Sequence, residues 1–339
     1  MHIALRLTTR VAALALTVGL FSGCAQTPEG SETSQSTPTS NPVVAPSTAA
    51  ASGKGIKVVA SNSILCDLTK QVAGNTVDLS CLVKPGADPH VYQATPEDRK
   101  AIENAKLVLY GGYNFEPSIV KLVQATSNTA PKIAVDEVAV PTPQKFEEDG
   151  KVENDPHVFH DAQNGVRIVE TIQTNLAKVA PENAELYAKN AKAITTELGQ
   201  IDTWIKSQIA TIPSASRTLV TTHDALGYYS KAYGIPVAAL EGISTEEKPT
   251  AARVKETVKT VEKVQVPTIF AELSINPKLI ETVAKEAKVK VSDKEIFADG
   301  LGETGSEGDT YQKMLKANTK NIVEGLGGKF TEFQAKASN

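Results

Sequence analysis

The chain has 339 residues, of which 41% are hydrophobic and 22% are charged, and its formal net charge at pH 7 is −4. This length suffices for two ordinary domains. A slightly acidic chain without a basic stripe excludes nucleic acid as an expected partner. Only five histidines and three cysteines occur in it, so the position of each one is informative.

The first 24 residues, "MHIALRLTTRVAALALTVGLFSGC", are typical of an export signal. Two arginines form its positive region, an apolar run follows, and small residues precede Cys24. The run is shorter than the roughly 20 residues that a membrane-spanning helix needs. Small residues directly before a cysteine predict a bacterial lipoprotein cleavage site with a lipid on Cys24, although Phe21 stands where leucine is commoner. Simple secretion with an incidental cysteine is the alternative.

Residues 25–54 are rich in Ser, Thr, Pro and Ala and contain almost no large apolar side chains. Such a segment cannot bury enough surface to fold, so we predict a disordered tether that spans roughly 30 Å on average. A lipid anchor on Cys24 and this tether would hold a folded body just outside a membrane. The expected location is the periplasm or the outer face of the cytoplasmic membrane.

From residue 55 onward, short apolar runs alternate with helical patterns. The helical stretches include "TPEDRKAIENA", with a capping pair at Thr95 and Asp98, and "TAARVKETVKTVEKV". Alternation of strands and helices predicts an α/β fold with mainly parallel sheets flanked by helices. The predicted strands cover residues 56–62, 77–83, 106–112 and 132–137 in the first half and 218–223, 236–240, 268–273 and 289–299 in the second.

One long helix is predicted in the middle of the chain, from Pro181 to Ile212. Its apolar residues recur mostly every three or four positions, and Pro213 follows its end. At about 1.5 Å per residue, roughly 30 helical residues extend about 45 Å, the length of a whole two-lobed molecule. We therefore predict two α/β lobes, at residues 55–180 and 213–335, joined by a rigid helix at 181–212.

Two cysteines remain outside the export signal, Cys66 and Cys81. A single leftover pair in an exported protein predicts a disulfide, and two buried free thiols are the alternative. The pair lies near the start of the first predicted helix and in the second predicted strand, so the bond would connect neighbouring elements.

The tripeptide Asp-Pro-His occurs twice, ending in His90 and in His157. Proline restricts its own φ and the residue before it, so each histidine is expected in a stiff loop rather than on a helix face. His223 and Asp299 also lie where predicted strands end, and α/β folds gather their ligands at such ends. Two of the four residues precede the long helix and two follow it, so a site between the lobes would receive two from each.

Three imidazoles and one carboxylate suit Zn²⁺ or Mn²⁺, whereas Ca²⁺ and Mg²⁺ prefer oxygen ligands. His160 is expected to neighbour the site or face solvent rather than bind the ion. Asp88 and Asp155 are expected either to orient the histidines beside them or to stiffen their loops, and Glu272 is a weaker candidate for a supporting contact. The predicted ligands of one divalent ion are His90, His157, His223 and Asp299.

Four segments occur in this order along the body: "GADPHVYQATPEDRKAIENAKLVLYGG", "DPHVFHD", "TTHDALGYYSKAYGIPVAALEGISTEEKPT" and "FADGLGETGSEGDTYQKML". They resemble the metal-receptor lipoproteins of bacterial ABC importers for manganese and zinc, and the resemblance covers the body nearly end to end. The resemblance implies two lobes joined by a long helix, one metal between them, and the same four ligands. It also implies docking on a membrane permease with a cytoplasmic ATPase. His160 departs from the family pattern, which usually has an apolar or small polar residue there.

The resemblance leaves manganese and zinc open, and it favours manganese. Many zinc receptors of the family carry a long histidine-rich loop before the second ligand, whereas residues 140–155 are acidic and contain no histidine. The context "HDALGYYSKAYG" is similar to that of manganese receptors that keep histidine at the position of His223. The ligand set itself would bind zinc more tightly, because affinity follows the Irving–Williams order.

A zinc-dependent hydrolase and a surface adhesin are the alternative functions. Catalytic zinc usually has three protein ligands and an open position, and the chain has neither a His-Glu-x-x-His motif nor an evident pair of nucleophile and base. It also lacks a phosphate-binding Gly-x-x-x-x-Gly-Lys-Ser/Thr loop, so another protein would have to hydrolyse ATP for transport. We predict a monomeric receptor that is not an enzyme.

For release of the ion we predict local opening, because a long helix between the lobes resists wide hinge bending. The segment "ADGLGETGSEGDT", which contains Asp299, has four glycines and few large apolar side chains. It is therefore predicted to be the most mobile of the ligand-bearing segments, followed by the acidic loop before His157.

Overall fold

A computed structural model of the protein describes residues 55–148, 150–246 and 248–336. The export signal, Cys24 and the predicted tether lie outside these residues. All described residues belong to one packed unit, Ser52–Asn339. Within this part of the chain, no helix is both long enough and apolar enough to cross a membrane.

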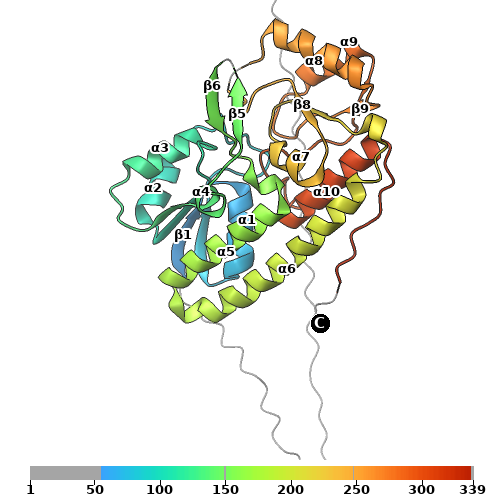
Figure 1. Ribbon diagram of the computed structural model, residues 1–339. Coiled ribbons are helices and arrows are strands. Elements are labelled where there is room, and N and C mark those ends of the chain that lie inside the picture. Colours follow the sequence, from blue (N-terminus) through green and yellow to red (C-terminus); the bar gives the residue numbers. More distant parts are fainter. Residues whose placement is uncertain (1–54, 149, 247, 337–339) are drawn as a thin grey trace, which may run out of the picture. The chain divides into compact units, whose positions relative to one another are not determined.

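The N-terminal lobe is built around a parallel four-stranded sheet with the order β2-β1-β3-β4 (Figure 1). Successive residues of β1 face opposite sides: Val58 packs in the core that contains Leu68, and Val59 packs with Ile102 and Ile119. Helices therefore cover both faces of the sheet, as parallel sheets require. The elements of this lobe are β1 (Ile56–Ala60), α1 (Ser63–Ala73), β2 (Val77–Cys81), α2 (Pro96–Asn104), β3 (Leu107–Tyr110), α3 (Pro117–Ala125), β4 (Lys132–Ala134), α4 (Val135–Ala139), β5 (Lys145–Glu148), β6 (Lys151–Asn154), η1 (Val158–His160) and α5 (Ala162–Val179).

The C-terminal lobe has two parallel strand pairs, β7 with β8 and β9 with β10. The backbone N–H of Phe270, just after β9, donates to the carbonyl of Val220 in β7 at 2.9 Å, so the four strands follow the order β8-β7-β9-β10. This is the order of the N-terminal sheet with shorter strands. The elements are η3 (Ser214–Ser216), β7 (Leu219–Thr221), α7 (Gly227–Tyr233), β8 (Val237–Ala239), α8 (Ala251–Val264), β9 (Thr268–Ile269), α9 (Lys278–Ala287), β10 (Lys290–Val291) and α10 (Tyr311–Gly325).

The predicted long helix is α6 (Ala184–Ile209), preceded by the 3-10 turn η2 (Pro181–Asn183). It runs along both lobes, packing against α1 and α5 on one side of the molecule and α10 on the other (Figure 1). Its 26 residues extend about 39 Å. The predicted architecture, two α/β lobes joined by a long helix, is confirmed.

Three local predictions differ from the structure. The acidic loop before His157 is an antiparallel hairpin of β5 and β6, whose strands are so charged and exposed that no alternating pattern reveals them. The predicted strand at 132–137 divides into β4 and the short helix α4, and the one at 289–299 forms a strand only at Lys290–Val291. Pairing along this segment is interrupted after Ser292 and resumes at Ile296, which forms a parallel bridge with Glu272.

The predicted disulfide between Cys66 and Cys81 is confirmed. It joins α1 to β2 across a sequence separation of 15 residues, with the two Cα atoms 5.6 Å apart. The predicted cap of α2 is also present, because Thr95 and Asp98 form a reciprocal capping box. Both features were local in sequence, which made them predictable.

Candidate metal site

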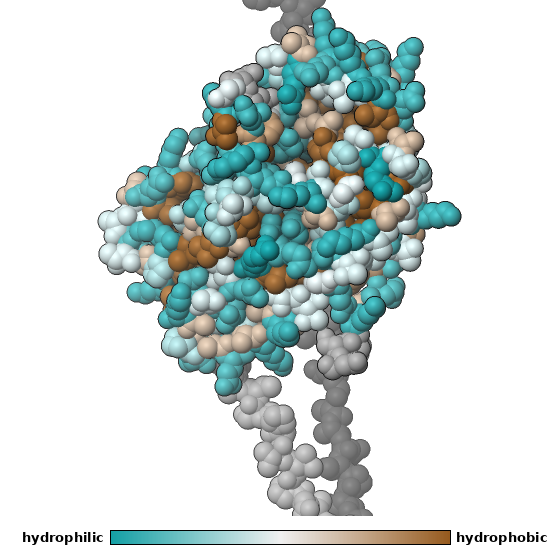
Figure 2. Space-filling model, in the orientation of Figure 1, coloured by the Kyte–Doolittle hydropathy of each residue, from teal (hydrophilic) through white to brown (hydrophobic). Residues whose placement is uncertain are grey.

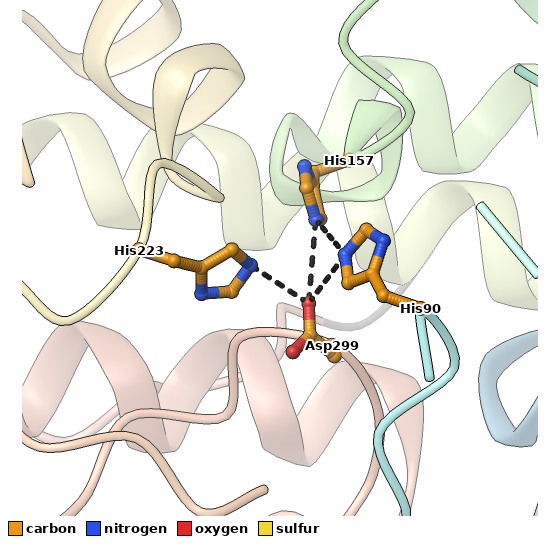
Figure 3. Close-up of side chains that lie close together, drawn as sticks. All are labelled: His90, His157, His223 and Asp299. Carbon is orange, nitrogen blue, oxygen red and sulfur yellow. Dashed lines mark hydrogen bonds and ion pairs between the residues drawn. The ribbon is translucent and has the colours of Figure 1, made fainter. Parts of the chain in front are cut away.

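The structure brings all four predicted ligand residues together between the lobes (Figure 3). His90 lies in the loop after β2 and His157 directly before η1, both in the N-terminal lobe. His223 follows β7, and Asp299 lies in the loop between β10 and α10 of the C-terminal lobe. All four residues are buried, and one nitrogen or oxygen from each lies within 4.8 Å of the others.

The four donor atoms have the spacing of a small coordination sphere. Asp299 Oδ1 lies 3.5 Å from Nε2 of His90, 3.3 Å from Nε2 of His157 and 3.1 Å from Nε2 of His223. The Nε2 atoms of His90 and His157 are 3.1 Å apart. Four donors placed tetrahedrally at about 2.0–2.1 Å from a metal lie about 3.3–3.4 Å from one another. The side chains are thus already spaced for one ion.

His157 is oriented by the aspartate of its own Asp-Pro-His tripeptide. Asp155 Oδ1 accepts the backbone N–H of His157 at 2.9 Å and lies 3.0 Å from its Nδ1. A hydrogen bond from Nδ1–H to a carboxylate leaves the Nε2 lone pair free for a metal. Asp155 therefore orients the ring, which decides between the two roles predicted for it.

His223 is oriented by a residue far along the chain. Glu272 Oε1 accepts the backbone N–H groups of Thr222 and His223 at 2.8 and 3.0 Å, and Oε2 lies 2.5 Å from Nδ1 of His223. Oε1 thus bonds the backbone, and Oε2 contacts the imidazole ring. Glu272, a weak candidate from sequence, is the residue that fixes the orientation of His223.

Asp299 is held by one contact to its carboxylate and by another to the backbone of the residue before it. Ser274 donates its hydroxyl hydrogen to Oδ2 at 3.1 Å, which leaves Oδ1 facing the three imidazoles. His160 Nε2 lies 2.7 Å from the carbonyl of the preceding residue, Ala298. His160 is fully buried, so it is a neighbour of the site as predicted and not a solvent-exposed residue. Burial lowers its pKa to about 3.

The electrostatics of the site favour a cation. Burial raises the pKa of Asp299, but the electrostatic attraction of the adjacent imidazoles, His223 above all, outweighs it, so its pKa lies well below the ordinary value. Burial lowers the pKa of His223, but Asp299 and Glu272 outweigh it and the pKa lies well above the ordinary value. Burial lowers the pKa of His90. Nε2 of His223 and Oδ1 of Asp299 are buried without an aligned hydrogen bond, as expected for atoms that face a shared cation.

The two α/β lobes, the long helix and the buried cluster of three histidines and one aspartate define the class of two-lobed metal receptors. The family model "ZnuA: Zinc-uptake complex component A periplasmic" matches residues 58–325. The chain belongs to this family.

Known relatives align with this chain over most of its length and most of their own. The manganese ABC transporter substrate-binding lipoprotein PsaA of Streptococcus mitis is 38% identical over 284 residues, which cover 82% of this chain and 91% of that protein. The PsaA of Streptococcus pneumoniae serotype 4 is 38% identical over 282 residues, covering 81% and 90%. Among solved structures, the periplasmic zinc-binding protein TroA of Treponema pallidum has a TM-score of 0.76 at 31% identity and covers 81% of this chain and 99% of its own.

A manganese-bound mutant of a periplasmic metal-binding protein from Candidatus Liberibacter asiaticus is also similar. Its TM-score is 0.72 at 26% identity, covering 80% of this chain and 99% of that one. The resemblance inferred from sequence motifs is therefore confirmed. Whether the four converging side chains bind the ion in this chain remains a prediction.

Proposed function

We propose that the protein is a high-affinity extracytoplasmic receptor for one divalent transition-metal ion, which it delivers to an ABC-type importer. The observation that carries this proposal is the convergence of four buried donor atoms, two from each lobe, on one point. The proposed ligands are His90, His157, His223 and Asp299.

Reversible binding suits this site better than hydrolysis. Four protein donors fill a tetrahedral sphere, whereas catalytic zinc usually keeps one position open for water. All four ligand residues are also buried, at 5% exposure or less, which leaves little room for a second reactant. The relatives PsaA and TroA are named as a substrate-binding protein and a metal-binding protein, which supports the same choice.

Manganese is the favoured cargo and zinc is the alternative. Both PsaA relatives are named as manganese receptors, and the hairpin before His157 has no histidine. Against this, three nitrogens and one oxygen bind Zn²⁺ more tightly than Mn²⁺ by the Irving–Williams order. TroA, which is named as a zinc-binding protein, supports the zinc alternative.

The proposed partners are a membrane permease and its cytoplasmic ATPase, and the proposed anchor is a lipid on Cys24. The name of the PsaA relatives, substrate-binding lipoprotein, supports both. We propose a monomer: on the face shown in Figure 2, hydrophobic residues form small separate patches within a mostly hydrophilic surface, whereas stable dimers need broad apolar contacts. An adhesive role is the weaker alternative.

Uptake of labelled manganese and zinc, measured separately in a deletion strain, tests the proposal. Deletion should abolish high-affinity uptake of the cargo metal, and wild-type protein should restore it. Asp299→Ala should fail to restore it, whereas Asp293→Ala, which changes an exposed aspartate of the same lobe, should succeed. Unchanged uptake of both metals in the deletion strain would contradict a receptor function, and loss of surface adhesion alone would favour the adhesin.

A further inference from the structure

A hydrogen bond between the lobes involves Asp88, two residues before His90. Thr245, in the loop between β8 and α8 of the C-terminal lobe, donates its hydroxyl hydrogen to Oδ2 of Asp88 in the N-terminal lobe at 2.6 Å. The other oxygen of the same carboxylate, Oδ1, accepts the backbone N–H of His90 at 2.9 Å. One carboxylate therefore connects a side chain of one lobe to the backbone of a proposed ligand in the other.

His90 is held differently from the other two histidines. The rings of His157 and His223 each have Nδ1 beside a carboxylate. Within the described residues, Nδ1 of His90 has no hydrogen-bond partner, and its ring instead meets the edge of Phe115 with the centroids 5.2 Å apart. His90 is 5% exposed, whereas the other two are fully buried. Its position depends on its loop, and Asp88 fixes that loop.

Several contacts hold the Asp299 segment, whose glycines by themselves predict mobility. His160 contacts the carbonyl of Ala298 at 2.7 Å, and the backbone N–H of Leu301 donates to the Ser63 hydroxyl at 2.9 Å. Ala298, Asp299 and Leu301 are all buried. Moving Asp299 out of the site would break these contacts and expose apolar surface. Withdrawing the His90 loop breaks two hydrogen bonds to the C-terminal lobe, the Thr245–Asp88 bond and the bond that the backbone N–H of Gly86 donates to the carbonyl of Leu301 at 2.9 Å.

We propose that Thr245 is a positioning residue that controls the rate of metal release. The Thr245–Asp88 bond keeps His90 on the ion, and its breakage lets the His90 loop withdraw first. This inference rests on the proposed function. It also reverses the order of opening predicted from the sequence. His90 is the most exposed of the four proposed ligands, and among the described residues no carboxylate lies beside its Nδ1, unlike Nδ1 of His157 and His223.

Release rates measured by stopped flow test this role. Wild type and Thr245→Val, loaded with Mn²⁺ or Zn²⁺, are mixed with excess chromogenic chelator. Thr245→Val should release the ion about tenfold faster, since a hydrogen bond to a charged group is lost, and Thr245→Ser should restore the wild-type rate. Ser244→Ala is the matched control, because among the described residues the Ser244 hydroxyl accepts only a local N–H, from Glu246 at 3.2 Å; its rate should match wild type.

A double-mutant cycle with His90 separates this role from a merely structural one. If Thr245 acts through His90, Thr245→Val should leave the release of Zn²⁺ unchanged in the His90→Ala background. Faster release in that background would overturn the inference. A wild-type release rate in Thr245→Val alone, or only a lower Tm of the metal-free protein, would also overturn it while leaving the receptor function intact. Absence of metal binding by the wild type would instead overturn the proposed function.

Discussion

The two lobes share a strand order and a buried glutamate, but they use that glutamate differently. In the C-terminal lobe, Glu272 accepts the backbone N–H groups of Thr222 and His223, the two residues after β7. In the N-terminal lobe, Glu116 accepts hydrogen bonds from the side chains of Ser61 and Asn62, the two residues after β1. The strand that each pair follows has the same place in its sheet.

His223 in the C-terminal lobe and Asn62 in the N-terminal lobe stand at equivalent positions, and they have different roles. His223 turns its ring toward the other lobe, whereas Asn62 caps α1 by accepting the backbone N–H of Leu65 at 2.9 Å. Beside Glu116 lies a second buried acid, Asp136: oxygens of both lie 3.1–3.3 Å from the point where a Cβ on Gly111 would stand. One sheet edge thus presents a proposed metal ligand, and the other carries two buried acids, with the proposed ligands of that lobe in later loops.

We expect the greatest loss of metal binding on replacement of Asp299, the proposed ligand that contacts all three imidazoles. Asp299→Ala should weaken metal binding by a factor of about 100 or more, because the only negative charge in the cluster is lost and three buried imidazoles remain. Isothermal titration with Zn²⁺ and Mn²⁺ measures it, with Asp293→Ala as the control. Binding within about threefold of wild type would show that the C-terminal lobe contributes no carboxylate to the ion.

The next effect concerns only the N-terminal lobe, which carries the disulfide. Replacing both Cys66 and Cys81 by serine should lower the free energy of unfolding by roughly 3 kcal/mol, because the bond closes a loop of about 15 residues in the unfolded chain. Denaturant unfolding of the metal-free protein measures it, and metal affinity should change little since neither cysteine touches the site. An unchanged unfolding midpoint would contradict the stabilising role.

A smaller effect distinguishes the two carboxylates that orient imidazoles. Glu272 uses both of its oxygens on His223 and its neighbour, whereas Asp155 uses Oδ1 for both contacts with His157. An amide retains one acceptor oxygen, so Glu272→Gln should weaken metal binding about 10- to 100-fold and Asp155→Asn only several-fold. The two variants are matched in chemistry. Equal losses in titrations would show that the charge matters and the bonding pattern does not.

The last expected effect is confined to the pH range in which one acid titrates: it is a pH dependence of stability from the acid pair of the N-terminal lobe. Burial, with Glu116 next in importance, raises the pKa of Asp136 well above its ordinary value, and burial raises that of Glu116. A raised pKa in the folded state means that stability is fully present below the unfolded pKa of about 4 and is lost as pH rises through the folded value.

Asp136→Asn cannot ionise, so its stability should fall less with increasing pH than that of the wild type. The difference between the two slopes should approach about 1.4 kcal/mol per pH unit in the range where Asp136 titrates. Denaturant unfolding between pH 5 and pH 9 in the presence of a chelator measures both curves. Parallel curves would show that Asp136 is not a buried acid of raised pKa.

The comparison of the lobes also explains how much the sequence could predict. His90 and His157 stand in repeated Asp-Pro-His tripeptides, whose aspartates bond the histidine two residues later. The sequence therefore pointed both to these two proposed ligands and to the aspartates that contact them. His223 and Asp299 were found from strand ends. Their supports were not found, or only weakly, because Glu272 lies 49 residues from His223 and Ser274 lies 25 from Asp299.

Fold-level predictions succeeded where a pattern was strong, because the long helix and the first strands have clear apolar periodicity. The mobility of the Asp299 segment stays a prediction from its glycines. The contacts of His160 with Ala298 and of Ser63 with the buried Leu301 have no signal in that local pattern. The Thr245–Asp88 bond spans 157 residues and has no local signal at all.

The central claim is that one ion binds between the lobes through two residues of each. Anomalous diffraction from crystals loaded separately with manganese and zinc, recorded at the absorption edge of each metal, tests it most directly. We expect a single peak at about 2.0–2.2 Å from Nε2 of His90, His157 and His223 and from a carboxylate oxygen of Asp299. A peak bound by residues of one lobe only, or located outside these four side chains, would contradict it.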